Sequence, residues 1–422
     1  MILGFFFALL LIGLPIALVL MVTAIIYIYN TGNTDLFSSL PQQLFGGVES
    51  YGLLAIPLFM LAGEFMNEGG LTKRLVRMAS VFVNGLRGGL AYVNLIANMM
   101  MASIMGSAVA QIAVMSKVMV PEMEKQGYDR AYAGALTAAG GLMSPIIPPS
   151  MLFVIYGVLA QIPIGDMFIA GVIPGLLMGT GFIIAVALIG IKYNYPKSAK
   201  ITLHQARKDF LLGLPAMSIP AVIIGGILLG FATPTESASI AIVAALLIGK
   251  FVYKELRFRN LGKVLYSTAI SSSAVIFMIA GAKMLGWALI FEQIPQTVAV
   301  WLTSLSENPF VFLLLVNLAL LVVGMVIDGI AALIMTVPIL LPIATDVYGI
   351  DPYHFGVVIC LNLVLGLLTP PVGSGLYVAA AMSNVGPTAI FRALVPFLTV
   401  SVMILLLLIW QPLLVTYLPS IK

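Results

Sequence analysis

One ten-residue stretch constrains the fold more than any other, because it places prolines inside a membrane-length apolar segment. It reads Gly-Leu-Met-Ser-Pro-Ile-Ile-Pro-Pro-Ser over residues 141–150, within a run from Ala131 to Gly165 that has no charged residue. Such a run is long enough to span a bilayer, but each proline removes a backbone donor and clashes with the preceding turn. Irregular backbone at membrane depth is tolerated only where protein buries it or it lines a polar cavity. The stretch therefore predicts a broken helix whose free carbonyls and new N-terminus suit ion binding.

A second stretch repeats this pattern in the other half of the chain. Residues 366–375 read Gly-Leu-Leu-Thr-Pro-Pro-Val-Gly-Ser-Gly, and Thr369-Pro370 corresponds to Ser144-Pro145, each pair three residues after a glycine. One interruption would be consistent with a simple kink. Two interruptions in corresponding halves predict a transporter whose binding site lies where two repeats meet.

The composition places the whole chain in a membrane. It is 61% hydrophobic and 9% charged, whereas soluble domains carry about 25% charged residues. Apolar runs of about 20 residues or more predict an all-α polytopic membrane protein. The first segment has no basic region and no cleavage site, so we expect a retained helix and not a signal peptide. The sequence has no Walker loop and no hydrolase or metalloprotease motif, so we expect neither an enzyme, nor ATP-driven transport, nor a nucleic-acid partner.

The apolar runs predict the order of the elements. The predicted spans are 2–29, 52–70, 167–191, 212–231, 237–253, 265–291 and 388–411, with surface helices at 71–83 and 294–305. Two re-entrant helical hairpins are predicted at 88–116, with its tip near Ser103–Ser107, and at 309–345, with its tip near Asp328. The broken helices are predicted at 130–160 and 353–383. For the first hairpin, a single tilted span is the alternative.

This order divides the chain into four predicted parts. Residues 1–87 and 193–308 are expected to form a scaffold, and residues 88–192 and 309–422 the two halves of a transport domain. Each half repeats a hairpin, a broken helix and a span. The sequence similarity between the two halves is weak at individual positions, as is usual for inverted repeats.

The distribution of charge predicts the orientation. Of the 20 Lys and Arg residues, 17 lie within the segments 73–87, 117–130, 192–208 and 250–263. Five other loops have no Lys or Arg but hold eight acidic residues: 31–50, 161–166, 232–236, 292–308 and 346–352. The positive-inside rule places the basic segments, and the N-terminus, in the cytoplasm and the C-terminus outside. The two hairpins then open from opposite sides, so the repeats are inverted.

The hairpin tips and helix breaks provide hard, neutral oxygen ligands that suit Na+ better than a transition metal. We therefore predict at least two Na+ sites. The first set of candidate ligands is Ser103, Gly106, Ser107, Gly141 and Ser144, and the second is Asp328, Gly329, Gly366 and Thr369. Asp328 would either ligate the cation directly or cap backbone donors at its tip. The alternative for both sets is that small residues and prolines only permit close packing and kinks.

Other polar residues in the apolar runs have two interpretations each. The candidate substrate contacts are Ser107, Gln111, Pro145, Pro370 and Arg392. Arg392 would attract a carboxylate or serve as a cytoplasmic anchor. Glu64 and Lys283 would either belong to a functional site or extend their charged ends toward the membrane–water interface. The asparagines at 94, 98, 317 and 362 are expected to form interhelical hydrogen bonds.

Four segments of the sequence resemble the large membrane subunit of TRAP (tripartite ATP-independent periplasmic) transporters. They are Ile-Pro-Leu-Phe-Met-Leu-Ala-Gly-Glu at 56–64, Gly-Ser-Ala-Val-Ala at 106–110, the stretch 141–150 and Phe-Ala-Thr-Pro-Thr-Glu at 231–236. The resemblance implies an elevator-type, Na+-driven importer in the bacterial inner membrane, with a fold similar to that of divalent-anion/Na+ symporters. It also implies a periplasmic binding protein that delivers an organic acid, and a small four-helix membrane subunit.

The resemblance also bears on the substrate. Gln111 stands where many members have Asp, which disfavours a simple C4-dicarboxylate, and the chain most resembles the sialic-acid members. The alternatives from the residues alone are a self-sufficient Na+/dicarboxylate symporter that needs no binding protein, and an anion channel.

Overall fold

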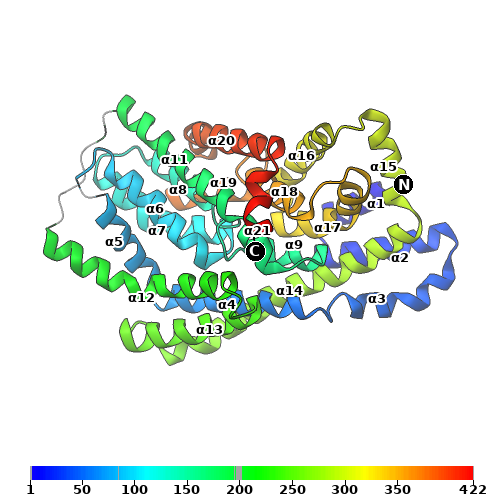
Figure 1. Cartoon of the computed structure of the whole chain (residues 1–422), viewed down its shortest axis with the longest axis horizontal. Coiled ribbons are helices and arrows are strands. Elements are labelled where there is room, and N and C mark those ends of the chain that lie inside the picture. Colours follow the sequence, from blue (N-terminus) through cyan, green and yellow to red (C-terminus); the bar gives the residue numbers. More distant parts are fainter. Residues whose placement is uncertain (1, 84, 194, 196–201, 422) are drawn as a thin grey trace.

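The chain folds entirely into helices in the part that its computed structural model describes, residues 2–83, 85–193, 195 and 202–421 (Figure 1). Seven helices of this part are apolar and long enough to cross a membrane. An eighth span is formed if the bent pair Thr34–Gly46 and Tyr51–Glu68, which meet at 47°, is counted as one. The prediction of an all-α polytopic membrane protein is therefore confirmed.

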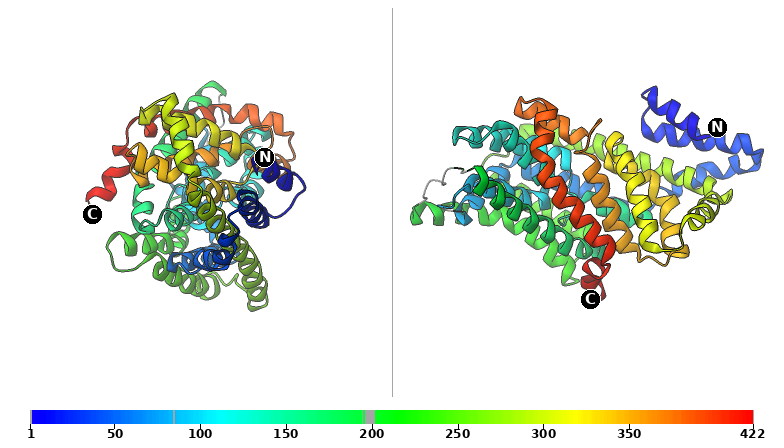
Figure 2. Two further views of the ribbon diagram at one scale, coloured as in Figure 1. Left: turned by 90° about the vertical axis from the view of Figure 1, so that its right-hand side faces the viewer. Right: turned by 90° about the horizontal axis from the view of Figure 1, so that it is seen from above.

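Nine helices come from the first and third predicted parts of the chain. They are α1 (Ile2–Leu11), α2 (Ile16–Thr31), α3 (Leu40–Gly46), α4 (Ala55–Glu68), α5 (Leu71–Phe82), α12 (Leu203–Leu228), α13 (Pro234–Leu247), α14 (Phe258–Phe291) and α15 (Ile294–Leu305). Helix α14 packs on α2, α3 and α4, α13 on α4, and α12 on α5. Figure 1 shows α4, α12, α13 and α14 along one long side of the molecule. Figure 2 shows α1 and α2 at its outer edge.

Twelve helices come from the second and fourth predicted parts. They are α6 (Gly89–Met105), α7 (Ala108–Lys125), α8 (Arg130–Gly141), α9 (Met151–Ala160), α10 (Ile164–Ala170), α11 (Val172–Tyr193), α16 (Pro309–Val326), α17 (Gly329–Pro342), α18 (Pro352–Gly366), α19 (Ser374–Ser383), α20 (Pro387–Trp410) and α21 (Leu413–Ile421). The second and fourth parts interlock with each other, because α9 packs on α17 and α18, and α19 packs on α7 and α8. Each broken helix thus lies against the hairpin of the other half.

The structure interrupts its helices at the predicted positions. Helices α6 and α7 pack as a pair that turns at Gly106-Ser107, and α16 and α17 turn at Ile327-Asp328. The predicted broken helices are α8 with α9 and α18 with α19. The predicted surface helices are α5 and α15, and α15 has the predicted bounds.

Several helix ends differ from the prediction. The span predicted over 2–29 is two helices, because Pro15 cannot continue α1 and instead precedes α2. The polar segment 31–50 contains the short helix α3, and a further helix, α21, follows Trp410. Helix α12 begins at Leu203, inside the predicted basic loop 192–208. Residues 194 and 196–201 of that loop lie outside the described part of the chain.

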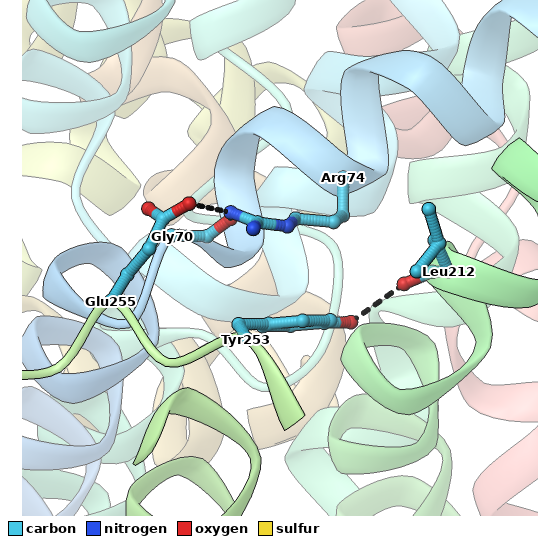
Figure 3. Close-up of polar contacts among 5 residues, drawn as sticks. All are labelled: Gly70, Arg74, Leu212, Tyr253 and Glu255. Atoms are coloured by element: carbon cyan, nitrogen blue, oxygen red, sulfur yellow. Dashed lines mark hydrogen bonds and ion pairs between the residues drawn. The ribbon is translucent and has the colours of Figure 1, made fainter. Parts of the chain in front are cut away.

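A group of polar contacts joins α5 to α12 and to the segment before α14 (Figure 3). The Arg74 guanidinium donates to the Gly70 carbonyl at 2.9 Å and forms an ion pair with Glu255. Its Cζ atom lies 4.6 Å from the centroid of the Tyr253 ring, a cation–π contact. The Tyr253 hydroxyl donates to the Leu212 carbonyl at 2.8 Å. These contacts join α5, the segment before α14, and α12.

Candidate functional site

The two hairpin tips are capped in the same way. At the first tip, Gly106 has a φ of +61°, and the Ser107 side chain accepts a bond from the Ala110 backbone N–H at 3.5 Å. At the second tip, Asp328 Oδ2 accepts from the Ile330 backbone N–H at 3.0 Å. Each acceptor satisfies a donor that the helix start would leave unpaired. The structure thus shows Asp328 in the capping role, one of the two considered for it, with its side chain exposed.

The first helix break, between α8 and α9, is closed by its own side chains. Ser150 accepts a bond from the Phe153 backbone N–H at 3.3 Å, and its hydroxyl donates to the Pro145 carbonyl at 2.5 Å. Ser144 is fully buried, and its hydroxyl has no hydrogen-bond partner in the described part of the chain. Burial of an unpaired hydroxyl is costly, so the Ser144 oxygen fits a position that a bound cation would satisfy.

The two breaks differ in their exposure. All residues of the first break, 142–150, are buried except Ile147, which is half-buried. In the second break, between α18 and α19, Pro371 and Val372 are exposed, as is Ser374 at the start of α19. The two interruptions are therefore placed differently in the molecule, although their sequences correspond.

The second break is bonded to the hairpin of its own half. The Gly373 backbone N–H donates to the Met325 carbonyl at 2.9 Å, two residues before the hairpin turns. Thr369 Oγ1 donates to the Leu365 carbonyl at 2.8 Å, within its own helix. The second hairpin tip therefore lies at the level of the helix break.

In both halves, one side-chain bond joins the first hairpin arm to the broken helix. Asn94 Nδ2 donates to Thr137 Oγ1 at 2.8 Å, and Asn362 Nδ2 donates to Asn317 Oδ1 at 2.7 Å. Thr137 and Asn362 each lie two helical turns before the Ser/Thr-Pro pair of their own break. The predicted interhelical bonds of the asparagines are confirmed, and their matching positions relate the two halves.

The first half extends this bond into a network through Gln111. Gln111 is 0% exposed, and its Nε2 atom donates to Asn98 Oδ1 and to the Asn98 carbonyl, both at 2.9 Å. It also lies 3.4 Å from the Gly140 carbonyl. Gln111 Oε1 and, in the second half, Asn362 Oδ1 are buried without a partner among the described residues. Gln111 thus joins α7 to α6 and α8, and the structure places it inside the helix packing.

The structure brings part of the first predicted ion site together. Ser103 and Gly106 line one small cavity with Ser150, at the end of the first break. Gly141 lies elsewhere, in tight packing, since a Cβ atom there would be 2.4 Å from Ile112 on α7. Hairpin tip and break therefore meet, while Gly141 permits the close approach of two helices.

The second predicted set also combines a tip with tight packing. A Cβ atom on Gly366 would lie 2.5 Å from the Gly324 backbone, so α16 and α18 are in backbone contact just before their interruptions. Gly329, beside Asp328 at the start of α17, faces Leu363 of α18 at 3.9 Å. The three helices α16, α17 and α18 therefore converge at the second tip.

The remaining candidate substrate contacts do not share one surface. Pro145 is buried, Ser107 and Pro370 are half-buried, and Arg392 is exposed on α20. None of the predicted ligands or substrate contacts lines a large cavity in the described chain, which has a volume of about 1060 Å3. Lys283 of α14 does line it. The cavity was missed because five separated segments form its walls, although Lys283 is the one charged residue in the run 265–291.

Comparison with known proteins identifies relatives over nearly the whole chain. The family profile "Tripartite ATP-independent periplasmic transporter, DctM component" matches residues 3–414. The sialic acid TRAP transporter large permease protein SiaM of Vibrio cholerae is 36% identical, over 94% of this chain and 91% of that protein. The 2,3-diketo-L-gulonate TRAP transporter large permease protein YiaN of Escherichia coli is also 36% identical, over 95% of this chain and 94% of that protein.

A solved structure is similar in fold. The crystal structure of the Alcanivorax borkumensis YdaH transporter superposes with a TM-score of 0.68, covering 93% of this chain and 96% of that chain. The sequences are only 13% identical, so this similarity concerns the fold alone. Sialic acid is not singled out among the relatives, because permeases with two different named substrates are equally similar.

Proposed function

The chain belongs to the DctM component family of the tripartite ATP-independent periplasmic transporters, and from this premise we propose a Na+-coupled organic-acid importer that works by an elevator mechanism. As a permease of this family it is not an enzyme, and it acts with a periplasmic binding protein. In the proposal a separate small four-helix membrane subunit completes the complex. The location is the bacterial inner membrane.

The observation that carries the proposal is the pair of matched hairpin–break units. Each has a capped tip, an interrupted helix and an Asn-mediated bond two turns before the interruption. Buried oxygens without a partner in the described chain lie in both halves, at Ser144, Gln111 and Asn362. Na+ binds such uncharged oxygens well. We assign one Na+ to each unit, held by tip and break oxygens.

The bonding at the tips supports re-entrant hairpins. The Gly373 N–H bond to Met325 places the second tip at a helix break, about midway along the α18–α19 pair. Ser103 and Gly106 meet the end of the first break in one small cavity. In the proposal both hairpins turn back near the bilayer centre. With the basic segments in the cytoplasm, the two units are inverted, the N-terminus is cytoplasmic and the C-terminus is periplasmic.

In the proposal the helices divide into a moving and a fixed part. The interlocked helices α6–α11 and α16–α21 would form the moving transport domain, and α1–α5 with α12–α15 the scaffold. Bound Na+ would neutralise part of the charge of the acid and hold the tips against the breaks. Moving one charge across 100 mV is worth about 2.3 kcal/mol, to which the Na+ gradient adds.

The test is uptake into proteoliposomes that contain this chain, its small subunit and its binding protein. We expect accumulation of N-acetylneuraminate or 2,3-diketo-L-gulonate that requires an inward Na+ gradient and is unaffected by ATP. Uptake driven by ATP, or uptake that only follows the solute's own gradient and does not need Na+, would contradict the proposal. Omitting the binding protein separates the alternatives, since saturable uptake by the chain alone indicates a self-sufficient symporter and linear flux indicates a channel.

The named substrates of the relatives guide the choice of solute. Sialic acid and 2,3-diketo-L-gulonate are attached to relatives of equal identity. We place this chain with the transporters of hydroxylated organic acids, and sialic acid is the first solute to test. Binding of labelled acids to the partner binding protein, measured by calorimetry, would decide between them.

A further inference from the structure

The cavity that Lys283 lines lies between the proposed scaffold and the proposed moving part. Its scaffold walls come from α3, the start of α13 and the second half of α14. Its other walls come from the turn between α9 and α10 and from Val337, Pro338, Leu341 and Pro342 of α17. All of these segments lie on or beside the acidic loops, on the side proposed to be periplasmic. A volume of about 1060 Å3 is at the upper end of the usual range for small-molecule sites, about 300–1,000 Å3.

Lys283 is the only basic residue that the described part of the chain places in the walls of this cavity. It lies eight residues before the end of α14, about 12 Å from the helix terminus at 1.5 Å per residue. Lys283 is exposed, and its ammonium group has no ion-pair partner in the part of the chain that the structure describes. A charge inside a membrane-spanning helix is costly and marks a functional site by default.

The backbone around Lys283 fixes the base of its side chain. A Cβ atom on Gly47, which follows α3, would be 3.1 Å from Lys283 Cβ, so α3 and α14 lie in close contact there. One turn further, a Cβ atom on Gly286 would be 3.1 Å from Pro338 of α17. The Cβ atom of Lys283 is thus in close contact with the segment that follows α3, in the wall of the cavity that the residue lines.

The other polar walls define the chemistry of a ligand. Neutral side chains that donate and accept hydrogen bonds line the same cavity: Gln43, Ser50, Gln161, Thr233 and Thr235. Among the described residues of the walls, Lys283 is the one cation and Asp166 the one acid, so a second carboxylate on the ligand would find no positive partner there. This combination suits a molecule with one acidic group and several hydroxyl or amide groups, and suits a dicarboxylate less well.

We propose that this cavity is a second solute site, in which Lys283 binds the carboxylate of a hydroxylated monoacid on its way to or from the hairpin tips. The inference rests on the proposed import of an organic acid. The site is separate from the tips, since no tip or break residue predicted to ligate Na+ lines it. Because its walls belong to both the fixed and the moving part, the site would change shape during transport.

A cysteine reporter tests the charge of the cavity without requiring transport. Gln43→Cys places a thiol in the wall, and the native Cys360 is fully buried and therefore unreactive. We expect the ratio of the rate of anionic 2-sulfonatoethyl methanethiosulfonate to that of its cationic trimethylammonium analogue to be higher here than for a free thiol in solution. Lys283→Gln should lower this anion-to-cation rate ratio about tenfold, since a unit charge at about 6 Å from a thiol changes each rate about threefold in water. Lys283→Arg should retain the ratio.

A matched control uses the same helix. Lys263 is exposed near the other end of α14, about 30 Å away. Lys263→Gln removes the same charge outside the cavity and should leave the rate ratio unchanged. An equal effect of both substitutions, or no effect of Lys283→Gln, would overturn the proposal.

Protection of the same thiol identifies the ligand class. In the purified Gln43→Cys protein, N-acetylneuraminate should slow labelling, and succinate should slow it several-fold less at equal concentration. Lys283→Gln should abolish this protection. Protection by phosphatidylglycerol vesicles but not by N-acetylneuraminate would assign the cavity to a lipid headgroup and overturn the solute site. The reagent ratio stands even if uptake fails, so a failure of the proposed function is distinguishable from a failure of this inference.

Discussion

The two hairpin–break units share their order of elements but are held together by different contacts. In the first, Gln111, Asn98, Asn94 and Thr137 form a chain of side-chain hydrogen bonds across α6, α7 and α8. In the second, a single asparagine pair is accompanied by the backbone contact between α16 and α18. One architecture can therefore be maintained either by a buried polar network or by glycines that let two backbones touch.

The two breaks also differ in how far the surrounding chain covers them. The first break is covered, since a Cβ atom on Gly171 would lie 2.7 Å from the Ile146 carbonyl and one on Gly175 would lie 2.9 Å from Ile147. The second break leaves Pro371 and Val372 exposed. A covered break needs side chains to satisfy its polar groups, whereas an exposed break can use water. The four predictions below test this difference.

The largest effect is expected where the second unit has backbone contact. Gly366→Ala would place a Cβ atom 2.5 Å from Gly324, and backbone cannot move aside as a side chain can. We expect a loss of about 3 kcal/mol, at the upper end for overpacking. Thermal unfolding, followed by a thiol-reactive dye that reports the exposure of buried Cys360, measures it. Gly190→Ala, a helical site with no atom within 4 Å, is the control, and equal midpoints for the two variants would refute the contact.

The next largest effect compares the stability lost when the hydrogen-bond network of the first unit or the asparagine pair of the second unit is broken. Asn98→Ala removes one acceptor of Gln111 Nε2 and the donor to Asn94 Oδ1, which leaves that buried amide oxygen unpaired, so we expect a cost of about 2 kcal/mol. Asn362→Ala breaks one side-chain link, and we expect about 1 kcal/mol. The same dye assay compares them. A double-mutant cycle of Asn98→Ala with Gln111→Ala should show coupling of about 1 kcal/mol, and additive effects would show that the network is not cooperative.

A third prediction uses the unpaired hydroxyl of the first break. Ser144→Ala removes no protein hydrogen bond among the described residues, so stability in K+ should stay within about 0.5 kcal/mol of the parent. In Na+ at ten times Kd, the parent should gain about 1.4 kcal/mol, and the variant should lose most of that gain. Midpoints in matched Na+ and K+ series measure it. An unchanged Na+ response would remove Ser144 from the ion site.

The smallest effects are expected at the surface helices that accompany each unit. Glu255→Gln weakens the partly exposed ion pair with Arg74 at α5, and such pairs contribute about 0–1 kcal/mol. Tyr348→Phe removes the 2.9 Å bond from the Tyr348 hydroxyl to the Ser306 carbonyl after α15 and should cost about 1 kcal/mol. High salt should abolish the first effect and leave the second. A salt-independent effect of Glu255→Gln would indicate that packing, not charge, holds α5.

Local chemistry allowed much of the fold to be predicted. Prolines and glycines marked both breaks, and the small residues at 106–107 and the acid at 328 marked both tips. The helix ends that were missed depend on weaker signals. The short helices α3 and α21 lie in segments too short or too polar for a span pattern, and α12 begins within a basic segment. Asn94 and Asn362 were correctly expected to bond between helices, but their partners could not be named.

The sequence by itself determined where the two broken helices and the two hairpins are interrupted, because a missing N–H group or a missing side chain acts within one or two turns of its own position. It also determined that the chain lies in a membrane, because apolar length and charge distribution are properties of composition. Only the tertiary structure decided that the first break is covered and the second exposed, that Gln111 faces protein, and that Lys283 reaches a cavity. Each of these depends on helices far apart in the chain, whose packing no local pattern encodes.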